Sequence, residues 1–118
     1  MTTVDQFLKA LAVVESSDDP EAWGDGGRAM GRWQVHPDRL WNEMHVHSIT
    51  PNLGETWDQL ESRVLRAIWA KYSIDYFPNE IAQFWHLGHL PLAYPAGWDL
   101  KYDARFGAAL ANAQEEMP

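Results

Sequence analysis

A long helical periodicity in the middle of the chain most constrains its fold. Between Thr56 and about Tyr76, large apolar side chains recur at spacings of three and four. They are Trp57, Leu60, Val64, Ile68, Trp69 and Tyr72. This spacing places them on one face of an α-helix, so it predicts a helix here. Thr56 is a suitable cap for its start, and Pro78 ends the helical pattern.

Two more helices are predicted in the N-terminal third. The segment from Thr3 to Val14 has apolar residues at helical spacing. Thr3 and Gln6 stand three residues apart, which is the pattern of a capping box. Residues 37–44 suit a short helix, because Pro37 would occupy its first turn.

Two helices are also predicted in the C-terminal third. One opens at Asn79 and stops at Gly88. Residues 89–98 contain several glycine and proline residues, so we expect a loop there. Asp99 can then cap a last helix that continues into the polar C-terminal segment.

Polar and glycine-rich segments separate these helices. Residues 18–31 contain four glycines, and residues 47–55 are polar with one proline and one glycine, so both are expected to be loops. A small β-hairpin within residues 24–36 fits the glycine-rich turns there. The sequence therefore predicts a mainly α-helical fold with functional loops, in which residues 1–118 form one domain.

The composition argues against several classes of protein. The 118 residues include no cysteine, which excludes a disulfide scaffold. The net charge of −8 disfavours nucleic acid as a partner, although Arg28, Arg32 and Arg39 are close enough in sequence for a local basic groove. No membrane span or signal peptide is recognisable. We therefore expect a protein that is made in the cytoplasm, is a monomer by default and has no membrane partner.

The five histidines include two close pairs. His45 and His47 are two residues apart, and His86 and His89 are three apart. The sequence has neither a His-Glu-x-x-His signature nor a cysteine ligand. We therefore expect no metal site and no other cofactor.

Glu15 is the strongest candidate for a catalytic residue. It follows an apolar helical run and is itself followed by Ser16-Ser17-Asp18-Asp19-Pro20, which does not continue a helix comfortably. The carboxyl group is therefore expected at the end of a helix, close to its apolar face. Loss of water raises the pKa of a carboxyl group, so Glu15 could donate a proton near neutral pH. The alternative is an ordinary helix-end acid that interacts with a nearby arginine.

The loop after Glu15 carries a second acid and a polar amide. Asp25 lies in the glycine-rich stretch and could activate a water molecule, but Asp-Gly is also a common turn pair. Gln34 could contact a substrate or fix the loop. Trp23, Trp33 and Trp85 lie on these segments and could stack on sugars, but they suit core packing equally well.

In their order, these motifs resemble the goose-type lysozyme and lytic transglycosylase family. Glu15-Ser16 matches the family's Glu-Ser, and Gly31-Arg32-Trp33-Gln34 stands where the family has Gly-Leu-Met-Gln. Trp23-Gly24-Asp25 resembles the Trp-Gly-Asp of the goose-type branch. Trp85-His86-Leu87-Gly88 resembles the family's Tyr-Asn-x-Gly more weakly. Tyr102 matches a tyrosine that the family has before its last helical segment. The resemblance covers roughly residues 3–110.

The resemblance implies a lysozyme-like domain that cleaves the β-1,4 bond between N-acetylmuramic acid and N-acetylglucosamine in peptidoglycan. Glu15 would be the general acid and Asp25 the candidate second carboxylate. The residues implied in substrate binding are Ser16, Gln34, Trp85, His86 and Tyr102. No cofactor is implied, and the partner would be the peptidoglycan glycan strand.

The chain departs from the family pattern at five positions. Arg32 and Trp33 replace Leu-Met, and Trp85 and His86 replace Tyr-Asn. His36 stands where the goose-type branch has a further aspartate, which favours the lytic transglycosylase route over hydrolysis. The alternative is a non-catalytic lysozyme-like binding module, such as a phage accessory protein. An enzyme without a signal peptide would reach the cell wall if a phage released it or a virion carried it.

Overall fold

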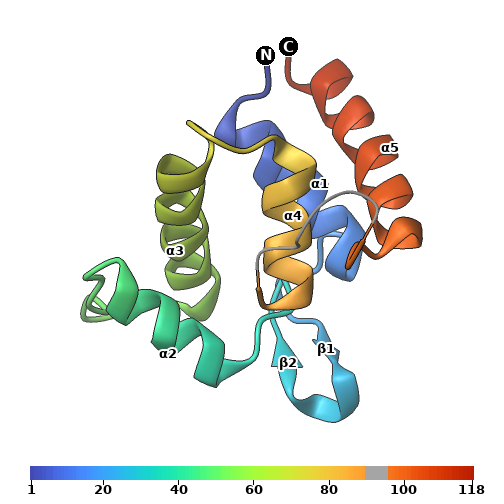
Figure 1. Ribbon diagram of the computed structural model, residues 1–118. Coiled ribbons are helices and arrows are strands. Elements are labelled where there is room, and N and C mark those ends of the chain that lie inside the picture. The colour runs from blue at the N-terminus through green and yellow to red at the C-terminus, as the bar shows by residue number, and fades with distance from the viewer. Residues whose placement is uncertain (90–95) are drawn as a thin grey trace.

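The structure is a computed structural model that describes residues 1–89 and 96–118 (Figure 1). Over these residues it is mainly helical, with one small antiparallel hairpin. The helices are α1 (Val4–Ser16), α2 (Pro37–Val46), α3 (Trp57–Tyr72), α4 (Pro78–Leu87) and α5 (Leu100–Glu116). The predicted fold class, mainly α with a hairpin, is confirmed. Residues 90–95 of the loop predicted over 89–98 lie outside the described residues.

The predicted caps determine where the helices begin. Thr3 and Gln6 form the capping box of α1, and Thr56 and Gln59 form that of α3. In each box the threonine side chain accepts from a backbone N–H, and the glutamine side chain accepts from the threonine N–H. Asp99 caps α5 by accepting from the backbone N–H of Tyr102 at 3.0 Å.

Some helix ends differ from the prediction. The helix expected to reach about Tyr76 ends at Tyr72, because Phe77 must be extended to precede Pro78. Pro78 itself is the first residue of α4, one residue before the expected start at Asn79. The short helix α2 continues past Met44 to Val46, and α1 continues past Val14 to Ser16.

The hairpin is short and strongly turned. Strand β1 (Trp23–Gly24) pairs with β2 (Ala29–Met30), so that Trp23 lies opposite Met30 and Gly24 lies opposite Ala29. Asp25–Gly27 forms a single 3₁₀ turn between them. This hairpin falls within the loop predicted over 18–31 and overlaps the segment 24–36 where a hairpin was predicted.

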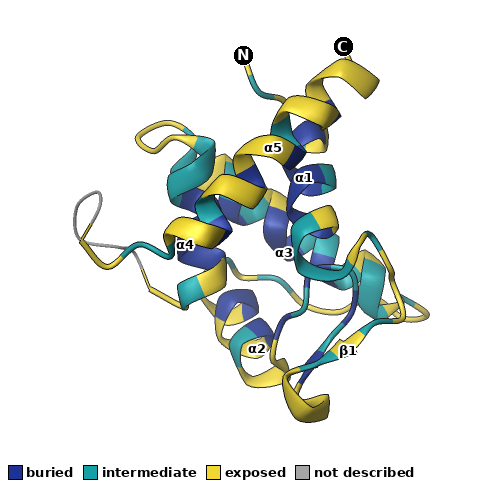
Figure 2. Ribbon diagram, turned by 90° about the vertical axis from the view of Figure 1, so that its right-hand side faces the viewer, coloured by how far each residue is buried: buried dark blue, intermediate teal, exposed yellow. Residues whose placement is uncertain are grey.

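The core lies between α1 and the helices around it. Helix α1 packs mainly against α5 and also touches α3, while α4 packs on α5 and α2 on α3. Figure 2 shows buried residues on the inward sides of these helices. The two ends of the chain lie close together (Figure 1), and the Gln6 side chain donates to the Met117 carbonyl at 2.6 Å. This arrangement fixes the C-terminal end of α1 beside the hairpin and the first turn of α5.

Gly31 gives a test of the packing at the base of the hairpin. Its φ is +91°, and a Cβ there would lie 2.6 Å from the Glu61 carboxyl and 2.8 Å from the Trp57 ring. Gly54 also has a positive φ, +80°, but nothing lies within 4 Å of a Cβ there. We expect Gly31→Ala to lower the free energy of unfolding by about 1–3 kcal/mol more than Gly54→Ala does, because only Gly31→Ala overpacks the interior. Urea unfolding of both variants measures the difference, and equal losses would contradict this packing.

Candidate active site

Glu15 lies in the last turn of α1, one residue before the helix ends at Ser16. Ser17 ends the helix in the left-handed region with φ of +56°, and its N–H returns to the Ala12 and Val13 carbonyls. The half-buried Glu15 side chain receives a hydrogen bond of 2.5 Å from the hydroxyl of Tyr102 on α5. The nearest partner of Glu15 is therefore a tyrosine rather than the arginine of the ordinary helix-end alternative.

The environment of Glu15 favours its protonated form. Burial raises the pKa of the Glu15 carboxyl above its ordinary value. The hydrogen bond from Tyr102 and the charges of His86, Arg105 and Arg39 lower the pKa, but together they offset less than burial adds. Burial and the adjacent Glu15 also raise the pKa of Tyr102, so its hydroxyl keeps its proton and remains a donor.

His86 and Asp99 support the tyrosine. The His86 ring stacks on the Tyr102 ring with centroids 3.9 Å apart and planes 7° apart. His86 Nε2 lies 2.8 Å from Asp99 Oδ2. The backbone N–H of Tyr102, and then the His86 hydrogen bond, hold the pKa of Asp99 below its usual value. Glu15, Tyr102, His86 and Asp99 thus form one hydrogen-bonded and stacked group.

Glu15 lines a cavity of about 430 Å³ between α1, the hairpin and the end of α4. Its walls bring together five of the seven site residues predicted from the sequence, namely Glu15, Asp25, Gln34, Trp85 and His86. The other lining residues are Ala29, Val35, His36, Arg39, Leu87 and Gly88. Segments far apart in the sequence therefore converge on one cavity that contains two carboxyl groups and two imidazoles.

Asp25 reaches this cavity from the turn of the hairpin. Its side chain is half exposed, and its backbone has a positive φ of +51°. Its Oδ2 lies 2.8 Å from His36 Nε2, and its Oδ1 lies 3.5 Å from Arg28 Nη2. Both carboxylate oxygens of Asp25 therefore have partners. His36 therefore contacts Asp25 directly.

Gln34 fixes the loop on which it lies. Its amide nitrogen donates to the Ala22 carbonyl at 3.1 Å and to the Gly31 carbonyl at 2.9 Å. A Cβ at position 24 would lie 2.2 Å from the Gln34 amide oxygen, so Gly24 gives this side chain its room. Of the two roles predicted for Gln34, these contacts correspond to the loop-fixing one, at the wall of the cavity.

Three residues predicted to bind substrate have other contacts. Trp85 is only 3% exposed, and its indole N–H donates to the Trp33 carbonyl at 2.8 Å, so its ring is no platform for sugar. Tyr102 is 1% exposed and donates to Glu15. Ser16 donates to the Arg32 carbonyl at 2.6 Å and accepts from the Asp19 N–H at 3.0 Å. These contacts join the elements that surround Glu15.

The other tryptophans divide between the core and the surface. Trp33 is 5% exposed, and its N–H donates to the Leu8 carbonyl, which excludes sugar stacking. Trp23 is 66% exposed. It lines a separate groove with Trp57 and Met30 rather than the cavity of Glu15.

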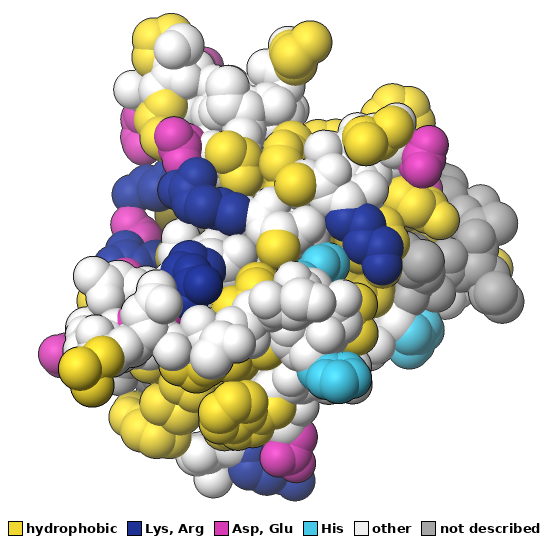
Figure 3. Space-filling view, turned by 90° about the vertical axis from the view of Figure 1, so that its left-hand side faces the viewer, with side chains coloured by type: hydrophobic (Ala, Val, Ile, Leu, Met, Phe, Trp, Pro, Cys, Tyr) yellow, Lys and Arg dark blue, Asp and Glu magenta, His cyan; other side chains and the backbone are white. Residues whose placement is uncertain are grey.

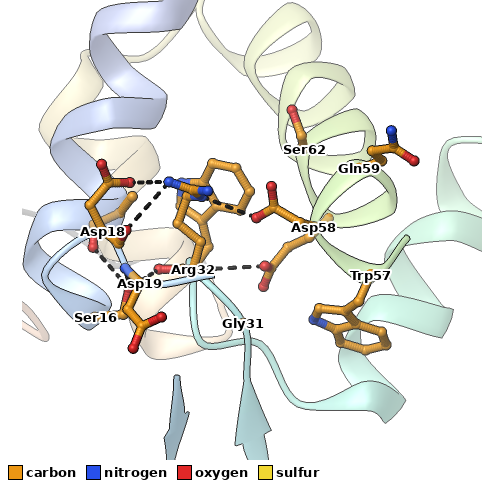
Figure 4. Close-up of polar contacts among 12 residues, drawn as sticks. Ser16, Asp18, Asp19, Gly31, Arg32, Trp57, Asp58, Gln59 and Ser62 are labelled. Carbon is orange, nitrogen blue, oxygen red and sulfur yellow. Dashed lines mark hydrogen bonds and ion pairs between the residues drawn. The ribbon is translucent and has the colours of Figure 1, made fainter. Parts of the chain in front are cut away.

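The three arginines that are close in sequence do not form a basic groove. Arg32 pairs with Asp18 at 2.6 Å and with Asp58 at 3.0 Å (Figure 4). Arg39 donates to the Phe84 and Trp85 carbonyls, and Arg28 lies beside Asp25. On the face seen in Figure 3, acidic side chains also stand next to several of the basic ones.

The sequence analysis missed the buried carboxyl of Glu61. Glu61 lies on α3 with no exposed surface, and burial raises the pKa of its carboxyl to about 8. A signal was present, because Glu61 lies between Trp57 and Val64 at the helical spacing of the apolar face. An acid at such a position is costly to bury unless it is protonated or hydrogen-bonded.

Comparison with known proteins adds no identification. No protein-family model, curated protein or solved structure matches this chain. Within residues 1–89 and 96–118, no group of three or more metal-ligating side chains could hold a metal ion. In the same residues no helix has the length and apolar character needed to cross a membrane.

The contact between Tyr102 and Glu15 gives a direct test of the site. Tyr102→Phe removes the hydroxyl that lowers the pKa of Glu15 and leaves the aromatic ring in place. We expect the pKa of Glu15 to rise, because the desolvated carboxylate loses its donor. Carbon-13 NMR titration of the Glu15 side chain measures this change. Tyr76→Phe is the matched control, because Tyr76 precedes α4 and has no hydrogen bond to Glu15. A Glu15 pKa in Tyr102→Phe that is equal to or lower than that of the wild-type protein would contradict the role of the Tyr102 hydroxyl.

Proposed function

We propose that this protein cleaves the β-1,4 bond between N-acetylmuramic acid and N-acetylglucosamine in peptidoglycan. The observation that carries the proposal is Glu15, a desolvated carboxyl of raised pKa that faces a cavity and is held by Tyr102. Glycosidic cleavage requires such a protonated acid beside the leaving oxygen. The ordered motifs that resemble the goose-type lysozyme and lytic transglycosylase family supply the substrate class.

In the first step, Glu15 donates its proton to the bridging oxygen. The bond between this oxygen and C1 of the muramic acid breaks, the glucosaminyl chain leaves with the proton, and positive charge develops at C1. Glu15 becomes a carboxylate, which the Tyr102 hydroxyl and the nearby positive charge of Arg39 stabilise. The same contacts that lower the pKa of Glu15 thus act on the form that exists after proton transfer.

In the second step, we propose that the sugar's own 6-hydroxyl attacks C1. The Glu15 carboxylate accepts the hydroxyl proton, O6 bonds to C1, and a 1,6-anhydro product forms without consuming water. Glu15 ends the cycle protonated, as it began. This route needs no second carboxylate, and the Asp25 carboxylate that a hydrolase would use as its base is paired with His36 and Arg28.

The competing proposal is a non-catalytic module that binds glycan in the same cavity. It is favoured by the departures from the family pattern at Arg32, Trp33, His36 and His86. The two proposals differ in turnover. A binding module would co-sediment with insoluble peptidoglycan but would release no soluble fragments from it.

Glu15→Gln tests the general acid. The amide keeps the shape of the side chain but carries no transferable proton, so we expect turnover to fall about 100- to 10,000-fold. Release of soluble fragments from isolated peptidoglycan measures the loss. Glu115→Gln, on the exposed end of α5, is the matched control and should retain full activity. A Glu15→Gln variant that is folded and has near wild-type turnover would exclude Glu15 as the acid.

Asp25→Asn separates the two chemical routes. If the 6-hydroxyl attacks C1, we expect the variant to keep at least about a tenth of wild-type turnover, because Asp25 then takes no proton in the reaction. If water attacks, the loss of a general base should reduce turnover by about 100-fold or more. Turbidity loss of a peptidoglycan suspension measures the rate, and the larger loss would contradict the transglycosylase route.

A further inference from the structure

A buried turn separates the cavity of Glu15 from a second carboxyl group. The turn consists of residues 31–35, and it is bound on both sides. On one side, the Arg32 carbonyl accepts from Ser16, and the Trp33 carbonyl accepts from Trp85, which lines the cavity. Figure 4 shows Arg32 between Asp18, in the loop after α1, and Asp58 of α3.

Glu61 lies on the interior side of this turn. Its Oε1 accepts from the Trp33 N–H at 3.4 Å, and the Val35 N–H also faces the carboxyl. Gly31 approaches so closely that a side chain there would meet Oε1. The carboxyl of Glu61 therefore serves as the acceptor for a stretch of backbone from which Gln34 and Val35 line the cavity.

The second oxygen of Glu61 has no partner among residues 1–89 and 96–118. Within these residues Oε2 is fully buried, and no hydrogen bond reaches it. The charged groups that face Glu61 are Asp58 on its own helix and Glu15 on α1, and both carry negative charge when ionised. A charge on Glu61 would therefore be repelled when these groups are ionised, and the N–H groups of Trp33 and Val35 offset only part of the cost of burying it.

We propose that Glu61 is a positioning residue that holds the 31–35 turn against the Glu15 cavity while its carboxyl is uncharged. Ionisation of Glu61 forces the turn to open so that water can reach the carboxylate. Opening displaces Gln34 from the cavity wall and weakens the contact between Arg32 and Ser16, next to Glu15. Because the pKa of Glu61 is about 8, this change falls just above neutral pH.

The structural part of the proposal is tested without any substrate. Nitrogen-15 NMR spectra follow the amides of Trp33 and Val35 and the indole N–H of Trp85 from pH 6 to pH 10. We expect all three signals to move together with a midpoint near pH 8, and to stop doing so in Glu61→Gln. Glu43→Gln changes another buried glutamate, on α2, and should leave the titration intact. Signals that do not titrate, or that titrate equally in Glu61→Gln, would overturn the proposal.

A second measurement keeps the test decisive if Glu61→Gln fails to fold. Carbon-13 NMR then follows the Glu61 carboxyl of the wild-type protein. A midpoint shared with the Trp33 amide supports the proposal, and different midpoints overturn it.

The catalytic part rests on the proposed peptidoglycan cleavage. Ionisation of a single group that must be uncharged, with a pKa of about 8, should add about a tenfold loss of turnover between pH 7 and pH 9, beyond the loss that ionisation of Glu15 causes. We expect Glu61→Gln to lack this additional loss while keeping its activity at pH 7. A decline that persists unchanged in Glu61→Gln would overturn the positioning role. If the wild-type protein cleaves nothing but the NMR titration is present, the proposed function fails and Glu61 still positions the turn.

Discussion

The five-residue turn 31–35 is the constraint on which the rest of the site depends. The amides of Trp33 and Val35 face Glu61 of α3, and the carbonyls of Arg32 and Trp33 accept from Ser16 of α1 and Trp85 of α4. The Trp33 and Val35 side chains are buried, and Gln34 lines the cavity. Arg32 adds ion pairs that join the loop after α1 to the first turn of α3. Three helices are thus held at fixed positions by one short stretch of backbone, and Glu15 lies where they meet.

The helical packing and the chemistry of Glu15 have a common cause. The contact of α1 with α5 brings the Tyr102 hydroxyl to the half-buried Glu15 carboxyl. Burial alone would raise the pKa of Glu15 without stabilising its carboxylate. The tyrosine and the neighbouring positive charges moderate that shift, so the proposed acid can both give up and take back a proton.

The sequence predicted the helices well, because capping residues and apolar spacing are local signals. Thr3, Thr56 and Asp99 cap helices as expected. The sequence also singled out five residues that the structure places around one cavity. It could not give the role of Tyr102 or the burial of Trp85, because both depend on packing between helices distant in sequence. The helical spacing indicated the burial of Glu61, but its hydrogen-bond partner, Trp33, is 28 residues away and could not be predicted.

We propose that Glu15 donates a proton to break a glycosidic bond and then takes a proton from the sugar's own 6-hydroxyl. Digestion of isolated peptidoglycan in water labelled with oxygen-18, followed by mass spectrometry of the released fragments, tests this claim most directly. If the sugar's own 6-hydroxyl attacks C1, the soluble fragments will have anhydro ends that contain no label. Fragments with labelled reducing ends would show that water is the nucleophile and contradict the transglycosylase route. Absence of released fragments, with glycan still bound, would contradict catalysis itself.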